Sequence, residues 1–118
     1  MTTIKEAVQD LFNNPQLSVQ EVVDRHYIPA FRQRTNGSWD DRAALVARVD
    51  EFRKHVEHAT VTVLDELIDG EHYAERHVID LLQRHGPRLL QEVYVFAQRD
   101  PDGRFVRIEE TTLALESQ

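Results

Sequence analysis

The fold is decided by the second half of the chain, which opens with residues 60–82, TVTVLDELIDGEHYAERHVIDLL. In this stretch, two runs of strand length flank the turn-forming pair at 69–70. Two further runs follow, one after the break at 85–87 and one after the turn at 100–103. Because short turns join consecutive strands, the pattern predicts an antiparallel meander. The expected strands are residues 60–68, 73–82, 89–98 and 105–115.

The first half has the period of amphipathic helices instead. Apolar residues recur three and four positions apart over residues 4–12, and Pro15 predicts the end of that helix just before it. Ser18 and Glu21 have the spacing of a capping box, which predicts the start of a second helix. This second helix includes Tyr27 and should stop before Pro29.

A third helix is expected after a short extended segment. Residues 30–39 are predicted to form this segment and a turn at Asn36-Gly37, and Asp40 or Asp41 then caps the helix. Helices followed by a run of strands predict an α+β domain with the helices packed on one face of a mainly antiparallel sheet.

Length and composition narrow the class of protein. The chain has 118 residues, which suits one domain spanning 1–118. Its 14 Lys and Arg against 21 Asp and Glu give a net charge of −7, which argues against a nucleic-acid binder. The absence of cysteine excludes disulfides and thiolate chemistry. No apolar stretch approaches the length of a membrane span, and the N-terminus lacks a signal-peptide pattern, so a cytoplasmic protein is expected.

The alternation within the expected strands leaves two interpretations open. Neither face of any of the last three strands is purely apolar, whereas a half-solvated sheet should have one apolar face. The charged groups either pair across strands on a solvated face or line a cavity with an apolar body and a few polar groups.

Four stretches resemble the nuclear transport factor 2-like superfamily, and its SnoaL-like branch in particular. They are residues 27–37, YIPAFRQRTNG; residues 41–48, DRAALVAR; residues 69–76, DGEHYAER; and residues 103–110, GRFVRIEE. Ketosteroid isomerases, polyketide cyclases and limonene epoxide hydrolase belong to this superfamily. The resemblance covers essentially the whole chain and implies a cone in which three N-terminal helices pack on a curved, mainly antiparallel sheet.

The resemblance also implies which face of the sheet points into the cone. That face carries Ala74, Arg76, Val78, Glu92, Tyr94, Phe96, Ile108 and Glu110. Arg76 and Glu110 match the positions of an arginine and a last-strand acid in the epoxide hydrolases. Val78 stands where those enzymes have an intervening aspartate, which argues against the same epoxide chemistry.

The expected catalytic residues are Glu110 and Arg76. Glu110 is predicted to act as a general base, and Arg76 to hold it ionised or to bind an anionic group. A hydroxyl of Tyr27 or Tyr94 is predicted to donate to a developing oxyanion. The expected ligand-binding residues are Tyr27, Trp39, Glu92, Tyr94, Phe96 and Ile108. Three of these residues also have a purely structural interpretation: an ion pair with Glu92 or Glu110 for Arg76, core packing for Tyr27, and plain packing in place of a lid over the pocket for Trp39.

No metal or cofactor is expected. His55 and His58 are three residues apart, but two imidazoles without further ligands do not make a zinc site.

Two functional hypotheses remain. The first is a pocket for a small apolar or mixed metabolite, used by a cofactor-independent isomerase, cyclase or hydrolase or by a non-catalytic binder. The second is an interaction module that uses the outer sheet face, which also suits the homodimer that the resemblance implies. The residues expected on this outer face are Tyr73, Glu75, His77, Val93, Val95, Arg107, Glu109 and Leu113.

Overall fold

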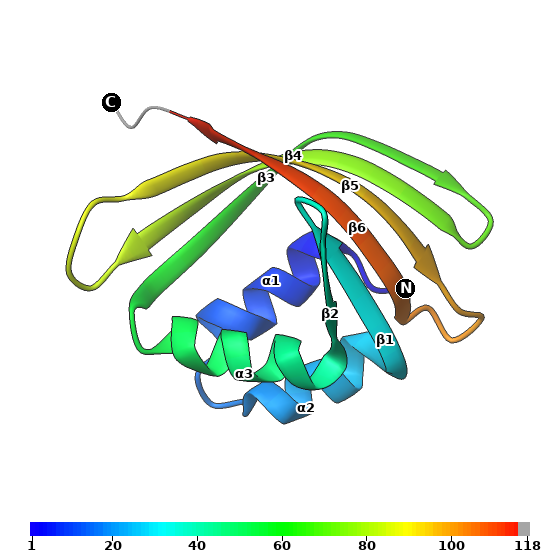
Figure 1. Cartoon of the computed structure of the whole chain (residues 1–118), viewed down its shortest axis with the longest axis horizontal. Helices are drawn as coiled ribbons and strands as arrows, with labels where there is room; N and C mark the ends of the chain where they lie inside the picture. Colours follow the sequence, from blue (N-terminus) through cyan, green and yellow to red (C-terminus); the bar gives the residue numbers. More distant parts are fainter. Residues whose placement is uncertain (116–118) are drawn as a thin grey trace.

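Three helices and a six-stranded sheet make up residues 1–115, the part of the chain that the computed structural model describes (Figure 1). The last three residues of the expected domain lie outside the described range. The helices are α1 (Ile4–Asn13), α2 (Val19–His26) and α3 (Arg42–Arg53). The strands are β1 (Tyr27–Thr35), β2 (Ser38–Asp41), β3 (Val56–Asp69), β4 (His72–Gln83), β5 (Leu89–Arg99) and β6 (Phe105–Leu115).

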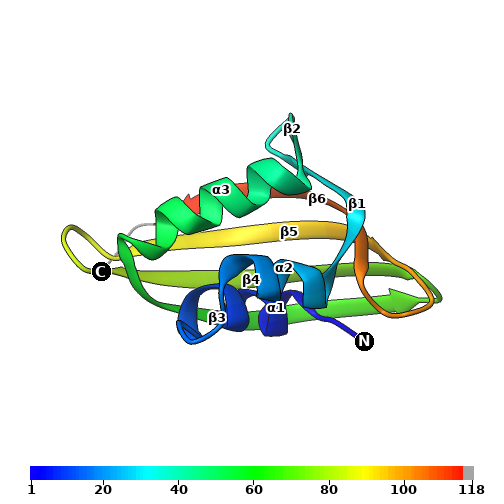
Figure 2. The same cartoon turned by 90° about the horizontal axis from the view of Figure 1, so that it is seen from below.

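The sheet has the order β2-β1-β6-β5-β4-β3. The antiparallel meander from β3 to β6 is confirmed, and the α+β class with it. The sheet is mixed, however, because β1 runs parallel to β6. It arches over the helices, so that all three lie on its concave face (Figures 1 and 2). None of the helices in the described part has the length and apolar character that crossing a bilayer requires.

The local signals at the helix ends behave as expected. Ser18 and Glu21 form the predicted capping box at the start of α2, and Asp41 caps α3 by accepting a hydrogen bond from the Ala44 amide. The turn at Asn36-Gly37 forms, with positive φ at both residues.

The second helix is shorter than expected. It ends at His26, and Tyr27 already has extended dihedral angles as the first residue of β1. The residue before a proline avoids the helical region, so Pro29 keeps Ile28 extended. Pairing with β6 then extends β1 to nine residues, where the sequence predicts only a short segment. As a result, α3 follows two strands and the three helices do not all precede the sheet.

Irregularities in strand pairing change which residues share a face. The register shifts between Val63 and Asp65 in β3, and between Gln98 and Arg99 of β5 against β6. A bulge inserts one residue, which reverses the alternation beyond it. This explains why Phe105 and Ile108 are both buried although they are three residues apart.

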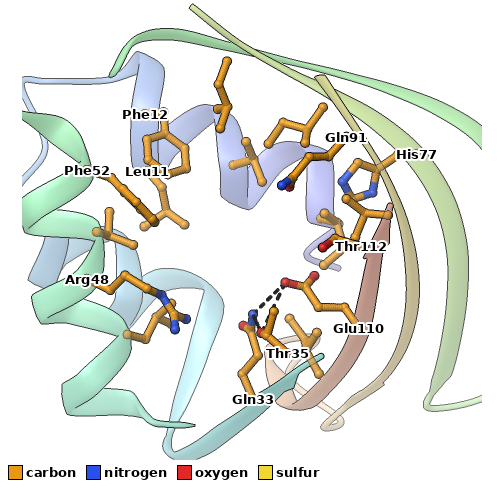
Figure 3. Close-up of a pocket in the computed structure, with 18 of the residues that line it drawn as sticks. Leu11, Phe12, Gln33, Thr35, Arg48, Phe52, His77, Gln91, Glu110 and Thr112 are labelled. Carbon is orange, nitrogen blue, oxygen red and sulfur yellow. Dashed lines mark hydrogen bonds between the residues drawn. The ribbon is translucent and has the colours of Figure 1, made fainter. Parts of the chain in front are cut away.

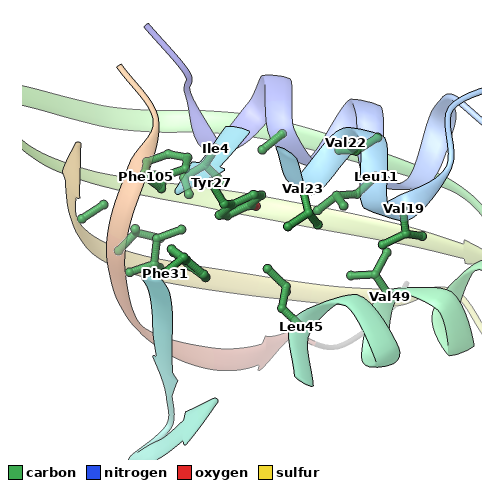
Figure 4. Close-up of a cluster of buried hydrophobic side chains, with 14 of the residues drawn as sticks. Ile4, Leu11, Val19, Val22, Val23, Tyr27, Phe31, Leu45, Val49 and Phe105 are labelled. Atoms are coloured by element: carbon green, nitrogen blue, oxygen red, sulfur yellow. The ribbon is translucent and has the colours of Figure 1, made fainter. Parts of the chain in front are cut away.

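An aromatic cluster packs between the concave face and the helices (Figure 4). The rings of Tyr27 and Phe31 meet edge to face at a centroid distance of 4.6 Å. Phe105 contacts Tyr27 and Tyr73, with centroid distances of 5.7 Å and 6.2 Å. This cluster fixes the start of β1 against β6, and so positions the residues that follow on both strands.

Candidate functional site

A cavity of about 400 Å³ lies between the concave face of the sheet and helices α1 and α3 (Figure 3). This volume is at the lower end of the range typical of small-ligand pockets, about 300–1,000 Å³. Most of the lining is apolar, and a few polar side chains converge from several elements. These are Gln33, Thr35, Asn36, Arg48, His77, Gln91, Glu110 and Thr112.

Glu110 is the buried carboxylate of the cavity. Gln33 Nε2 donates a hydrogen bond to Glu110 Oε1 over 3.0 Å, and Thr35 Oγ1 approaches the same oxygen at 3.5 Å. Thr35 lies opposite Glu110 in the parallel pairing of β1 with β6, so the sheet itself brings these groups together. Burial raises the pKa of the Glu110 carboxyl, although the charges of His77 and Arg48 and the Thr35 hydrogen bond oppose this shift.

A second buried acid lies behind His77. The Nδ1 atom of His77 and Oε1 of Glu75 are 2.5 Å apart, and both side chains are almost completely shielded from solvent. The other oxygen of Glu75 has no hydrogen-bond partner within the described residues. His77 lines the cavity and Glu75 does not, so the imidazole stands between the acid and the cavity.

Arg48 brings a positive charge from α3. Its guanidinium forms an ion pair with Asp40 of β2, next to the turn that joins β1 and β2. In the close-up, Arg48 lies across the cavity from His77 (Figure 3).

Tyr27 contributes a neutral phenol. Burial raises the pKa of Tyr27, and the negative charge of Glu110 raises it further. The hydroxyl therefore stays protonated over the physiological range.

The opposite part of the cavity is apolar. Phe12 of α1 and Phe52 of α3 lie 6.3 Å apart between ring centroids, and Leu81 and Leu89 face them from the sheet. A ligand that fills the cavity thus meets an apolar wall at one end and hydrogen-bonding groups at the other.

Comparisons with solved structures identify this architecture. One match is a protein of unknown function from Exiguobacterium sp. 255-15, with a TM-score of 0.69, 14% identity, and coverage of 98% of this chain and 100% of that one. Another is a protein assigned as a SnoaL-like polyketide cyclase from Shewanella denitrificans OS-217, with a TM-score of 0.74, 8% identity, and coverage of 91% and 85%. At these identities the matches show the fold alone, and that fold is nuclear transport factor 2-like (NTF2-like).

A third match is named for a ketosteroid isomerase-like fold. It is a protein with a ketosteroid isomerase-like fold from Catenulispora acidiphila DSM 44928, solved with trimethylamine, with a TM-score of 0.67, 8% identity, and coverage of 87% of this chain and 78% of that one. No family model matches the chain, and no curated protein matches it. The resemblance inferred from the sequence is therefore supported at the level of the fold.

Four of the predicted site residues lie on the opposite face of the sheet. Arg76, Glu92, Tyr94 and Phe96 point away from the cavity, so the predicted inward orientation is wrong for them. Arg76 instead pairs with Asp65 and Glu92 on the outer face, as in its structural interpretation.

The reason is which of the two alternating sets of residues in β5 faces the helices. Val93, Val95 and Ala97 form the more apolar set of that strand, and they are buried against the helices. Residues directly opposite each other in a sheet share a face. Because His77 lies opposite Val93 and Glu75 opposite Val95, both turn inward with them and Arg76 turns outward. For the same reason, five residues that were expected on the outer face lie on the inner one: Tyr73, Glu75, His77, Val93 and Val95.

The other predicted residues divide between the cavity and the surface. Tyr27, Ile108 and Glu110 line the cavity. Trp39 does not; it is 47% exposed in β2, with the Arg32 guanidinium 4.7 Å from its ring centre.

Sequence reasoning missed most of the polar lining. It gave no role to Gln33, Thr35, Arg48 or Gln91. It placed His77, and Glu75 behind it, on the outer face of the sheet. One signal was available, because the set of alternate residues in 89–97 is apolar at four of five positions and predicts the buried face of that strand. Within residues 1–115, no group of three or more His, Asp or Glu side chains is placed to hold a metal ion.

Proposed function

We propose that the protein is an enzyme that binds a small, largely apolar compound in the cavity and moves a proton with Glu110. The observation that carries this proposal is a carboxyl group buried in an apolar cavity, with a raised pKa and a fixed orientation. An effective general base has a pKa near the working pH, and burial is the usual way to bring a carboxyl group there.

The surrounding residues suit this role. Gln33 donates to one oxygen of Glu110, and so fixes the direction of the carboxyl plane while the second oxygen stays available to a substrate. The neutral phenol of Tyr27 is a donor for an oxygen on which negative charge develops. Together these groups support abstraction of a proton next to a carbonyl, as in an isomerase or cyclase, or activation of a water molecule, as in a hydrolase.

The shape of the cavity restricts the substrate. The aromatic pair Phe12 and Phe52 and the neighbouring leucines favour an apolar body, and the polar groups lie at the other end. We therefore expect a compact compound with one hydrogen-bonding end. This proposal includes the roles of Glu110, Tyr27 and Ile108 in the site. It also includes a cytoplasmic location and activity without a cofactor.

The proposal is tested by a thermal-shift screen of metabolites, followed by turnover of the compounds that bind. Glu110→Gln should reduce turnover by about 10²–10⁴-fold, the usual contribution of a general base, and leave binding within a few-fold. Glu109→Gln, a neighbouring acid on the outer face, is the matched control. If Glu110→Gln turns over the bound compound at the wild-type rate, Glu110 is not the base and the site is a binding pocket.

We further propose that a second copy of the chain covers the outer sheet face. All three helices lie on the other side of the sheet, and Leu67 and Phe96 are 75% and 73% exposed. Both residues flank Ala74 in one row across β3, β4 and β5, which makes a continuous apolar band. The Arg76 ion pairs with Asp65 and Glu92 border this band, so both charge signs are available to a symmetric partner.

Sedimentation at low protein concentration tests the dimer. The wild type should sediment as a dimer, and Phe96→Glu should shift it to a monomer with an unchanged far-UV spectrum. Glu57→Gln, an exposed position at the start of β3, serves as the control. A wild type that remains monomeric across the concentration range would refute this part of the proposal.

A further inference from the structure

We propose that Glu75 and His77 form a second proton-transfer group in the cavity, in which His77 contacts the substrate and Glu75 orients the His77 imidazole. This inference rests on the proposed function, because it assigns to the same cavity a proton donor that works with Glu110.

The burial of Glu75 first calls for an explanation. Its side chain is 0% exposed, and His77 is the residue that hydrogen-bonds to it. Burying an ionised carboxylate costs several kcal/mol unless a charge or hydrogen bonds compensate for it. A partner only 2.5 Å away supplies that compensation, so the two side chains form one unit.

The contact also decides which nitrogen of His77 is free. Nδ1 faces Glu75, where the acid accepts its proton. Nε2 is then the atom left for the cavity that His77 lines. A carboxylate on one ring nitrogen fixes the tautomer and stabilises the imidazolium form, which makes the other nitrogen an effective proton donor and acceptor.

The position of His77 relative to Glu110 leaves room for a substrate. Val95 lies between Glu75 and Glu110 in one cross-strand row, and Val93 lies between His77 and Thr112 in the next. Strands β4 and β6 are thus two strand spacings apart, roughly 10 Å. His77 of β4 and Glu110 of β6 both line the cavity and lie on the same side of it (Figure 3). The charge of His77 accordingly lowers the pKa of Glu110. The other charges nearby are Arg48, paired with Asp40, and Glu66, which accepts from the Tyr73 hydroxyl.

Two proton carriers that reach the same part of a small cavity suit an enolisable carbonyl compound. The Glu110 carboxylate takes the proton from the carbon next to the carbonyl, and the electron pair of that C–H bond forms the C=C bond of the enol. The carbonyl oxygen receives the Nε2 proton of the His77 imidazolium, so the carbonyl becomes a hydroxyl and His77 becomes neutral, with its remaining proton on Nδ1. When the enol collapses, His77 recovers its proton and Glu110 returns one to carbon, which restores both groups and needs no further reactant.

Two probes and one spectroscopic measurement test the pair. 2-Naphthol, a flat molecule with one hydroxyl, reports binding of an enol-like group. Acetophenone in deuterated water reports exchange of its methyl protons. Nitrogen-15 spectra of the imidazoles report whether His77 carries its proton on Nδ1. The variants are Glu75→Gln, Glu75→Asp to restore the charge, and Glu66→Gln, at the cross-strand neighbour of Glu75, as the control.

The expected result is that Glu75→Gln abolishes the Nδ1 preference of His77, weakens 2-naphthol binding about tenfold and slows acetophenone exchange at least tenfold. Glu75→Asp should restore part of the Nδ1 preference, of the 2-naphthol binding and of the exchange rate. Glu66→Gln should change neither the binding nor the exchange rate by more than about twofold. A merely structural Glu75 would leave the tautomer unchanged.

The outcomes separate this inference from the proposed function. If Glu75→Gln keeps the tautomer, the binding and the exchange rate of the wild type, the inference is wrong. Slow acetophenone exchange by Glu110→Gln would then still support Glu110 as the general base. If Glu110→Gln exchanges acetophenone normally, the proposed role of Glu110 is wrong, and the tautomer and 2-naphthol results still decide the role of Glu75. A wild type that neither binds 2-naphthol nor exchanges acetophenone overturns both.

Discussion

Replacing Glu110 by Gln should make the protein more stable at neutral pH, because the cavity holds a carboxyl group whose charge is poorly solvated. Burial is the main cause of the raised pKa of Glu110, and it outweighs the opposing charges of His77 and Arg48. Glutamine has nearly the same shape, and its side-chain oxygen can still accept the hydrogen bond from Gln33 Nε2. The substitution therefore removes the charge and little else.

The size of the effect follows from proton linkage. Below the ordinary value of 4.5, Glu110 is protonated in the folded and unfolded chains, and the two proteins should have similar free energies of unfolding. Above it the unfolded chain releases the proton while the folded chain keeps it. The wild type then loses about 1.4 kcal/mol for each pH unit until the folded carboxyl ionises, after which the difference stays constant.

Urea denaturation from about pH 4 to pH 8 measures this difference directly, because every other titrating group is common to both proteins. Glu109→Gln is the matched control, since Glu109 is 33% exposed on the outer face and its ion pairs with Arg34 and Arg107 are long, at 3.8 Å and 3.5 Å. Its difference from the wild type should stay within about 0.5 kcal/mol at every pH. A Glu110→Gln protein that is less stable than the wild type at neutral pH, or whose difference does not grow with pH, would refute the reasoning.

Two further predictions concern the core and the support of Glu110. Phe105→Ala, at a fully buried position, should lower the free energy of unfolding by about 3–5 kcal/mol in the same urea assay, whereas Leu64→Ala, at a half-exposed one, should cost much less. Gln33→Leu removes a donor that favours the charged form of Glu110 and should raise its pKa further. The pH range over which stability falls should then extend upward, and an unchanged range would show that this hydrogen bond does not control the ionisation.

The parts of the fold that the sequence predicts are those with local causes. Ser18 and Glu21 cap a helix because they are three residues apart, and Asn36-Gly37 turns because these residues tolerate positive φ. The pairing of β1 with β6 joins Tyr27 to Phe105, and no local pattern encodes such a contact. The length of β1, and the end of α2 at His26, depend on that contact.

The face of each strand is harder to predict for a related reason. Alternation divides a strand into two sets, but the register between strands decides which sets lie together. His77 lies opposite Val93, so odd residues pair with odd residues between β4 and β5. Glu110 lies opposite Val95, so even residues pair with odd ones between β5 and β6. Taking the even set as inward in all three strands is therefore right for Glu110 and wrong for Arg76.

The conflict between charge and burial itself marks the site. Aliphatic side chains at these positions would make the inward face of the sheet more uniformly apolar. Instead, the positions are occupied by Glu75, His77 and Glu110. Sequences that fold well satisfy most local preferences, and the exceptions concentrate where function requires them. Charged residues on both faces of a strand therefore have two different causes here. On the outer face Arg76 pairs with Asp65 and Glu92 in contact with solvent. On the inner face Glu110 lines the cavity, and Glu75 lies behind His77. Only the charges on the inner face lower the stability of the folded chain. The pH dependence of Glu110→Gln therefore distinguishes a functional charge from a structural one.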